Sequence, residues 1–124
     1  MRESTRINNL VIYEKRICSE LAEVECLRAL DRMKLAGVLG EGDLASRHAA
    51  LRAFLDICEI AELTKGILKR ACSPLPVVLG ALDTIHLVTA FTWRESNGGE
   101  IVMATHDLAL ARAARIHVME VVGA

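Results

Sequence analysis

The sequence predicts an α/β fold with a mainly parallel sheet flanked by helices. Two observations support this class. Short aliphatic runs alternate with longer segments in which apolar residues recur every three or four positions, as in amphipathic helices. Residues 101–104 (Ile-Val-Met-Ala) are apolar on both faces, which is typical of a strand inside a parallel sheet. At 124 residues the chain has the length of one domain, so we expect a single domain over 1–124.

The first predicted elements are short extended segments and a long helix. Residues 10–13 (Leu-Val-Ile-Tyr) and 17–18 (Ile-Cys) predict extended segments on either side of a charged break. Ser19 offers a side-chain oxygen to the free amides at the start of a helix rich in Leu and Ala. Gly37 is expected to end this helix, because glycine readily adopts the left-handed conformation that closes helices.

A second helix, a strand and a short helix follow. Asp43 is expected to cap the second helix. The apolar stripe of this helix recurs at steps of four and three and consists of Leu44, His48, Leu51, Leu55 and Cys58. Residues 59–63 predict a strand, and Thr64 is expected to cap a short helix that ends near Cys72.

The last third of the chain predicts a long helix, then a strand, a helix and a strand. Residues 79–94 carry apolar side chains at helical spacing, and the Ser-Asn-Gly-Gly of residues 96–99 ends that pattern. The strand at 101–104 leads to Asp107, which opens a short Ala-rich helix. Residues 117–122 close the chain as another strand.

Composition excludes several classes of protein. Apolar residues make up 52% of the chain and charged residues 25%, which argues against disorder and against a coiled-coil rod. The 15 basic residues nearly balance the 16 acidic ones, so capture of nucleic acid by an overall positive surface is not expected. Aromatic residues are only 3% of the chain, too few for a platform that stacks single-stranded bases.

The cysteines and the apolar segments bear on the compartment. Cys18, Cys26, Cys58 and Cys72 form no Cys-x-x-Cys pair, and their aliphatic neighbours are typical of buried reduced thiols. We therefore expect neither a disulfide framework nor a zinc site. No apolar stretch is long enough for a bilayer, and the first six residues lack the apolar core of a signal peptide. These features predict a cytoplasmic protein.

Three acidic residues occupy positions that an ordinary solvated surface does not favour. Glu25 and Asp83 each have small or apolar residues one helical turn before and after them, where burying a charge is costly. Asp107 follows an apolar strand at the carboxyl edge of the predicted sheet, where α/β folds usually bind ligands. Carboxylates that meet repel one another, and a divalent cation such as Mg²⁺ or Mn²⁺ relieves that repulsion.

Two of these acids also have a purely structural interpretation. Glu25 would pair with Arg28 or Arg32 on its own helix. Asp107 would serve only as a helix cap. Spacing alone does not decide between these interpretations and a cluster of carboxylates.

Three segments together are similar to a known family. They are residues 19–30 (SELAEVECLRAL), 81–90 (ALDTIHLVTA) and 104–107 (ATHD). With these segments in this order, the chain from about residue 17 onward resembles the PIN-domain family and is most similar to the VapC-type toxins of bacterial toxin–antitoxin pairs. The resemblance implies a PIN-like three-layer sandwich, in which helices flank a mainly parallel sheet.

The resemblance also implies a site and partners. Glu25, Asp83 and Asp107 would be ligands of Mg²⁺ or Mn²⁺, with a metal-bound water as the nucleophile that cleaves an RNA substrate. Thr105 matches a threonine whose hydroxyl could orient a carboxylate or a water. Family members typically pair as homodimers and are held inactive by a cognate antitoxin protein. The resemblance therefore implies an endoribonuclease that is the toxin component of such a pair.

The start of the chain departs from the family pattern. Members normally open with a strand that carries an Asp, whereas here no Asp precedes Asp31. We therefore expect an N-terminally truncated version of the fold, in which residues 1–16 are atypical. Glu14 is the one candidate to replace the first carboxylate, but only ten residues separate it from Glu25. Loss of one carboxylate from the cluster should weaken cation binding and activity.

Two further interpretations stay open. The chain could be a noncatalytic PIN-fold module that binds a partner or dimerises, or it could be an unrelated small α/β protein. His86 lies three residues after Asp83 and could donate a hydrogen bond to it, or it could simply pack within its helix. His106 could touch a substrate phosphate or be merely exposed.

Overall fold

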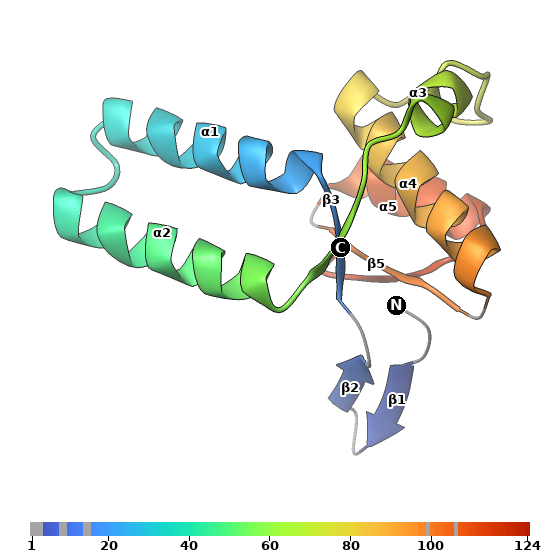
Figure 1. Ribbon diagram of the computed structural model, residues 1–124, viewed down its shortest axis with the longest axis horizontal. Helices are drawn as coiled ribbons and strands as arrows, with labels where there is room; N and C mark the ends of the chain where they lie inside the picture. Colours follow the sequence, from blue (N-terminus) through green and yellow to red (C-terminus); the bar gives the residue numbers. More distant parts are fainter. Residues whose placement is uncertain (1–3, 8–9, 14–15, 99, 106) are drawn as a thin grey trace. The chain divides into compact units, whose positions relative to one another are not determined.

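The computed structural model describes residues 4–7, 10–13, 16–98, 100–105 and 107–124. The described residues form both helices and short strands, so the chain is of the mixed α/β kind (Figure 1). The elements are β1 (Ser4–Ile7), β2 (Leu10–Tyr13), β3 (Ile17–Ser19), α1 (Leu21–Leu35), α2 (Glu41–Asp56), β4 (Glu59–Ala61), α3 (Lys65–Ala71), α4 (Ala81–Asn97), β5 (Val102–Ala104), α5 (Leu108–Ile116) and β6 (Glu120–Val122). They belong to two compact units, one of Met1–Lys15 with Leu63–Ala124 and the other of Arg16–Glu62.

The described strands form three separate two-stranded sheets. β3 pairs with β4 and β5 pairs with β6, both in the predicted parallel sense. β2 lies where a strand was predicted and pairs with β1 in an antiparallel hairpin. The strand over residues 4–7 was not predicted, because its sequence, Ser-Thr-Arg-Ile, contains a single aliphatic residue. Among the described residues, no helix combines the length and hydropathy that a bilayer span requires.

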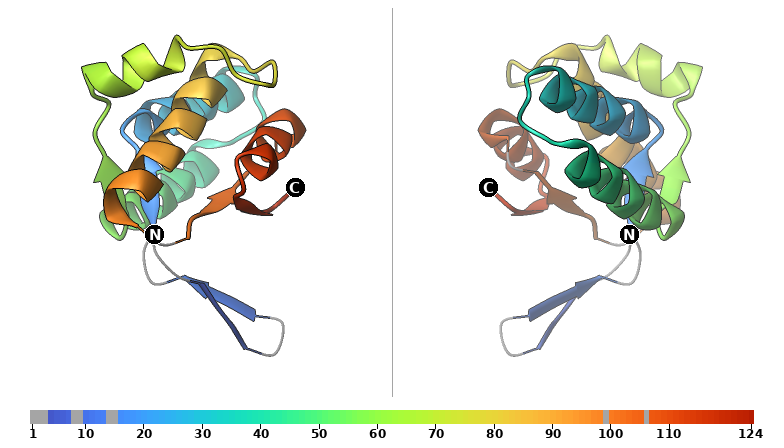
Figure 2. Two further views of the ribbon diagram at one scale, coloured as in Figure 1. Left: turned by 90° about the vertical axis from the view of Figure 1, so that its right-hand side faces the viewer. Right: turned by 90° about the vertical axis from the view of Figure 1, so that its left-hand side faces the viewer.

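The unit Arg16–Glu62 is a helical hairpin tied at its base by the β3–β4 pair. α1 and α2 lie side by side and run in opposite directions (Figures 1 and 2). Two hydrogen bonds flank the parallel strand pair: the Glu20 N–H donates to the Ala61 carbonyl at 2.9 Å, and the Glu59 N–H donates to the Arg16 carbonyl at 2.8 Å. The chain therefore enters and leaves the hairpin through two strands that bond to each other.

The two helices of this unit begin differently from each other. The Ser19 hydroxyl accepts from the Leu21 N–H at 3.2 Å as predicted, but the N-cap residue of α1 is Glu20. The prediction for Asp43 was wrong: α2 already begins at Glu41, and the N-cap is Gly40, which has no side chain. Asp43 lies in the first turn, where its negative charge stabilises the helix by interacting with the positive end of the helix dipole.

The predicted faces and bounds after α2 were partly right. Within the predicted apolar stripe of α2, Leu55 is buried but His48 is exposed. β4 ends at Ala61, two residues before the predicted end of that strand. Thr64 caps α3 as predicted, with its hydroxyl accepting from the Ile67 N–H at 3.1 Å.

The core of the other unit lies where α3, α4 and α5 pack with the β5–β6 pair. The buried cluster consists of Ile67, Leu87, Val88, Phe91, Ile101, Leu110, Ala113, Ala114 and Met119. Leu87 and Val88 on α4 have no exposed surface. Ala113 and Ala114 on α5 are equally buried, and such small side chains let a helix backbone approach its neighbours closely. α4 continues to Asn97, beyond the predicted end, and closes at Gly98 with φ of +66°.

The last predicted strand starts three residues late, because residues 117–119 close α5 instead. The Val118 N–H donates to the Arg115 carbonyl, and the Met119 N–H donates to the Ala114 carbonyl. This is the double hydrogen bond of a Schellman motif, whose key position requires a left-handed residue. Val118 occupies it with φ of +62°, a conformation that β-branched side chains disfavour.

Replacing Val118 with glycine should raise the free energy of unfolding by about 1 kcal/mol, after allowing for the greater freedom of glycine in the unfolded chain. The lost side chain is 87% exposed, so little packing disappears with it. Urea denaturation followed by the fluorescence of Trp93, the single tryptophan, measures the change, since Trp93 packs against this core.

The matched control reverses the substitution in the same motif at the end of α1. There Gly37 has φ of +73°, and a Cβ atom added to it would meet nothing within 4 Å. Gly37→Val should therefore destabilise through the backbone alone. A stability of Val118→Gly equal to or below that of the parent chain would show that Val118 is not strained.

Candidate functional site

Thr105 and Asp107 form a hydrogen-bonded turn at the carboxyl end of β5. The Thr105 N–H donates to the Val122 carbonyl at 3.0 Å, which extends the β5–β6 pairing by one bond. The Thr105 hydroxyl accepts from the Asp107 N–H at 3.1 Å. Asp107 Oδ1 accepts from the Leu110 N–H at 2.8 Å, so Asp107 is the N-cap of α5. The carboxylate of Asp107 is exposed, and the cap bond uses only its Oδ1 atom.

Asp83 lies in the first turn of α4, half-buried, in the unit that also holds Asp107. The helix begins after Gly80, whose carbonyl accepts from both the N–H and the hydroxyl of Thr84. Thr84 is buried, so this pair of hydrogen bonds anchors the start of the helix from within. The position suits a carboxylate, because the helix N-terminus carries a partial positive charge.

Glu25 lies in the second turn of α1, half-buried, in the other unit. Charged neighbours on this helix form their own pairs. Arg28, one of the two predicted structural partners of Glu25, forms an ion pair with Asp31 at 2.8 Å. Glu23 forms an ion pair with Arg52 of α2 at 3.4 Å.

The structure thus brings together Thr105 and Asp107 from the predicted site. Within each unit taken by itself, the described residues include no three His, Cys, Asp or Glu side chains grouped as a metal site. The donor chemistry of the predicted set still suits Mg²⁺ or Mn²⁺, because all three predicted ligands are carboxylates. Glu14 and His106 lie outside the described residues.

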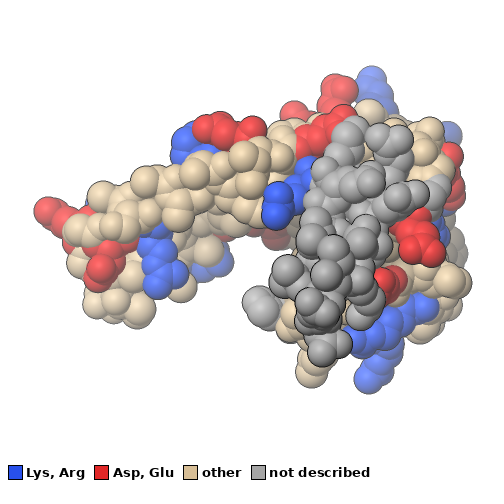
Figure 3. Space-filling view, turned by 90° about the horizontal axis from the view of Figure 1, so that it is seen from below, with Lys and Arg blue, Asp and Glu red and all other residues tan. Residues whose placement is uncertain are grey.

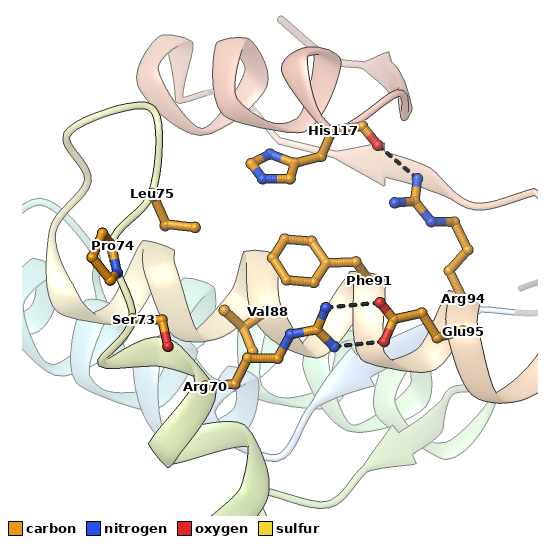
Figure 4. A pocket seen from close by; sticks show the side chains of 9 residues that line it. All are labelled: Arg70, Ser73, Pro74, Leu75, Val88, Phe91, Arg94, Glu95 and His117. Atoms are coloured by element: carbon orange, nitrogen blue, oxygen red, sulfur yellow. Dashed lines mark hydrogen bonds and ion pairs between the residues drawn. The ribbon is translucent and has the colours of Figure 1, made fainter.

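A cavity of about 380 Å³ lies in the unit of α3, α4 and α5 (Figure 4). It is lined by Arg70, Ser73, Pro74, Leu75, Val88, Phe91, Arg94, Glu95 and His117. Figure 4 shows the Phe91 ring between the His117 ring, 4.9 Å away centre to centre, and the Arg70 guanidinium, 4.7 Å from the Phe91 centre. Sequence reasoning missed this cavity, because its residues come from separate elements and form no motif.

Two arginines of the cavity are held by specific acceptors. Arg94 Nη1 donates to the carbonyl of His117 at 2.7 Å, at the negative end of α5. Arg70 donates two hydrogen bonds to the Glu95 carboxylate, at 2.6 and 2.7 Å. These bonds, aided by the attraction between the two opposite charges, lower the pKa of Glu95 and raise the pKa of Arg70.

The lowered pKa of Glu95 predicts a small pH-dependent contribution to stability. A carboxyl group whose pKa is lower in the folded state stabilises the fold at any pH above its pKa in the unfolded chain, about 4.3 for glutamate. This stabilisation is lost as the pH falls through the lower pKa of the folded state. The parent chain should therefore be slightly more stable than Glu95→Gln at neutral pH and equally stable in strong acid. Denaturation midpoints of both proteins across this range measure the difference.

The control for this prediction is Glu100→Gln, which removes another exposed carboxylate from the same unit. It should not reproduce the change with pH. A constant gap between the parent chain and Glu95→Gln from neutral to acidic pH would show that the ion pair does not act through protonation. The expected gap is small, because Glu95 is solvent-exposed and water screens the pair.

The charged side chains do not gather by sign on the face that Figure 3 shows. Among the residues coloured there, basic and acidic groups are interspersed. This agrees with the balance of 15 basic and 16 acidic residues.

Comparison with protein-family models, with curated proteins and with solved structures found no match to this chain.

Proposed function

We propose that the chain is a PIN-like metal-dependent endoribonuclease of the toxin type, with the three-layer sandwich of that family. The observation that carries the proposal is the Thr105–Asp107 turn at the carboxyl end of a parallel strand. Ligands of α/β folds bind at this edge of the sheet. The ordered resemblance of three sequence segments adds Glu25 and Asp83 to the site.

The proposed roles follow from the chemistry of the side chains. The carboxylates of Glu25, Asp83 and Asp107 would hold Mg²⁺ or Mn²⁺, which prefer oxygen ligands. Such a cation would supply positive charge for the phosphodiester and the means to activate water. Thr105 is a positioning residue: its hydroxyl accepts from the Asp107 N–H and fixes the turn that presents the carboxylate.

The charge balance of the chain supports a metal-dependent enzyme over one that binds RNA by basic residues alone. The chain carries a formal net charge of −1. Phosphate needs positive charge nearby, and a divalent cation held by carboxylates would provide that charge locally. In this proposal the homodimer and the cognate antitoxin are the partners, as the resemblance implies.

A second candidate function is a noncatalytic module of the same family that binds a partner or dimerises. The observation that favours it is the absence of any Asp before Asp31, where the family normally carries its first metal ligand. A cluster that lacks one carboxylate holds its cation more weakly. The two candidates differ in one measurable property, which is metal-dependent cleavage.

The experiment is cleavage of single-stranded RNA by the purified chain with Mn²⁺ or Mg²⁺, with and without EDTA. We expect cleavage that EDTA abolishes and that Asp83→Asn reduces by about a hundredfold or more, because an amide cannot supply the charge that holds the cation. The matched control is Asp43→Asn, since Asp43 lies in the first turn of α2 after a glycine N-cap, as Asp83 does in α4.

The outcomes separate the candidates. Cleavage that survives EDTA, or that Asp43→Asn and Asp83→Asn reduce equally, would contradict the metal-dependent site. No cleavage with either cation would favour the noncatalytic module. Binding of Mn²⁺, measured by titration calorimetry on the same two variants, tests the ligand role of Asp83 separately from catalysis.

A further inference from the structure

Two thiols lie in contact at the base of the helical hairpin. The Cys18 thiol donates a hydrogen bond to the sulfur of Cys58, with 3.4 Å between the two Sγ atoms. Both side chains are half-buried. The other two cysteines, Cys26 and Cys72, are exposed. The sequence did not predict this contact, because 40 positions separate the two residues and no motif links them.

The strand pairing holds the two sulfurs in place. Cys18 is the central residue of β3, and Cys58 directly precedes β4. The register pairs Ile17 with Glu59 and Cys18 with Ile60, so Cys58 lies two positions before the partner of Cys18, and the two cysteines form a diagonal pair. A disulfide requires about 2.05 Å between the sulfurs, so each must move by less than 1 Å, about half of the difference.

The two thiols are chemically different. Burial raises the pKa of Cys18 to about 12, with further contributions from the Cys58 hydrogen bond and from the nearby Cys58 and Cys26 sulfurs. Cys18 is therefore protonated at neutral pH, and its hydrogen points at Cys58. Cys58, as the acceptor, places its sulfur against the Cys18 thiol.

We propose that Cys18 and Cys58 are an oxidation site that forms a reversible disulfide with hydrogen peroxide. The Cys58 sulfur attacks one peroxide oxygen, the O–O bond breaks, and a sulfenic acid and one water form. The Cys18 sulfur then attacks the Cys58 sulfur, the S–O bond breaks, and a second water leaves with the Cys18 proton. Two thiols lose two electrons, and one peroxide is reduced to two waters.

The disulfide clamps the base of the helical hairpin. It joins the strand that enters α1 to Cys58, which lies between the end of α2 and β4, so it closes the whole hairpin into a covalent loop. The cross-link restricts the unfolded chain and therefore favours the folded hairpin. A thiol reductant reverses it. None of this depends on the proposed ribonuclease activity.

The test uses the full chain treated with hydrogen peroxide at neutral pH, then denatured and labelled with a maleimide. Titratable thiols should fall from the four present to two, with a mass loss of about 2 Da and recovery after dithiothreitol. Peptide mapping should find Cys18 linked to Cys58. The oxidised chain should also unfold at a higher urea concentration than the reduced chain.

Variants make the assignment specific. Cys26→Ser/Cys72→Ser, which changes only the exposed cysteines, should oxidise like the parent chain. Cys18→Ser should form no intramolecular disulfide and should instead accumulate sulfenic or sulfinic acid at Cys58. Retention of all four thiols in the parent chain, or a mapped link between Cys18 and Cys26, would overturn the proposal. The mapping is done on the parent chain, so it stands even if a variant fails to fold.

Discussion

Replacing Asp107 with asparagine should reduce metal-dependent RNA cleavage by about a hundredfold or more and leave the fold nearly as stable as before. Asp107 has two roles in the proposed enzyme, and asparagine separates them. As the N-cap of α5 it accepts from the Leu110 N–H, and an asparagine oxygen accepts the same bond equally well. As a metal ligand it needs a negative charge, which asparagine lacks.

Two further variants complete this experiment. Asp107→Ala removes both roles, so it should lose cleavage and also about 1 kcal/mol of stability. Thr105→Val keeps the carboxylate but removes the hydroxyl that accepts from the Asp107 N–H, so it should reduce cleavage less than Asp107→Asn. RNA cleavage and urea midpoints are measured on all three proteins. Full cleavage by Asp107→Asn would leave Asp107 as a helix cap alone.

Features that depend on residues close in sequence could be predicted. Thr64 and Asp107 cap their helices through a bond to the third residue after them, so each cap lies within four residues. The closure of α1 at Gly37 is equally local. The prediction for Asp43 failed even though capping depends on nearby residues, because several residues near a helix start satisfy the capping pattern. In α2 the N-cap is Gly40, which has no side chain.

Features that depend on distant residues could not be predicted in this way. The Arg70–Glu95 pair and the Cys18–Cys58 contact each join residues from different elements, and nothing local marks the partners. The late start of β6 has another cause. The apolar run from residue 117 suits a strand, but the Schellman closure of α5 uses its first three residues, including Val118 at positive φ.

The candidate site shows the same division. The Thr105–Asp107 turn is local, and its hydrogen bonds follow from the order of strand, turn and helix. Spacing does not encode whether Asp107, Asp83 and Glu25 act together as the resemblance implies, so the cleavage and binding experiments test that proposal. The cavity beside Phe91 is tertiary in the same sense, since α3, α4 and the end of α5 all contribute to it.

Leu87→Ala should lower the free energy of unfolding by about 3 kcal/mol, because it removes buried methyl groups and leaves a cavity in a close-packed core. Leu87 has no exposed surface and shares its core cluster with Phe91 and Ala113, which are also buried. The matched control is Leu82→Ala, the same substitution in the same helix at a side chain that is 49% exposed, which should cost less than about 1 kcal/mol. Urea denaturation followed by Trp93 fluorescence compares the two, since Trp93 belongs to α4 and packs on that cluster. Equal losses for both variants would mean that α4 does not bury Leu87 in the folded protein, and the packing of α3, α4 and α5 described above would then be incorrect.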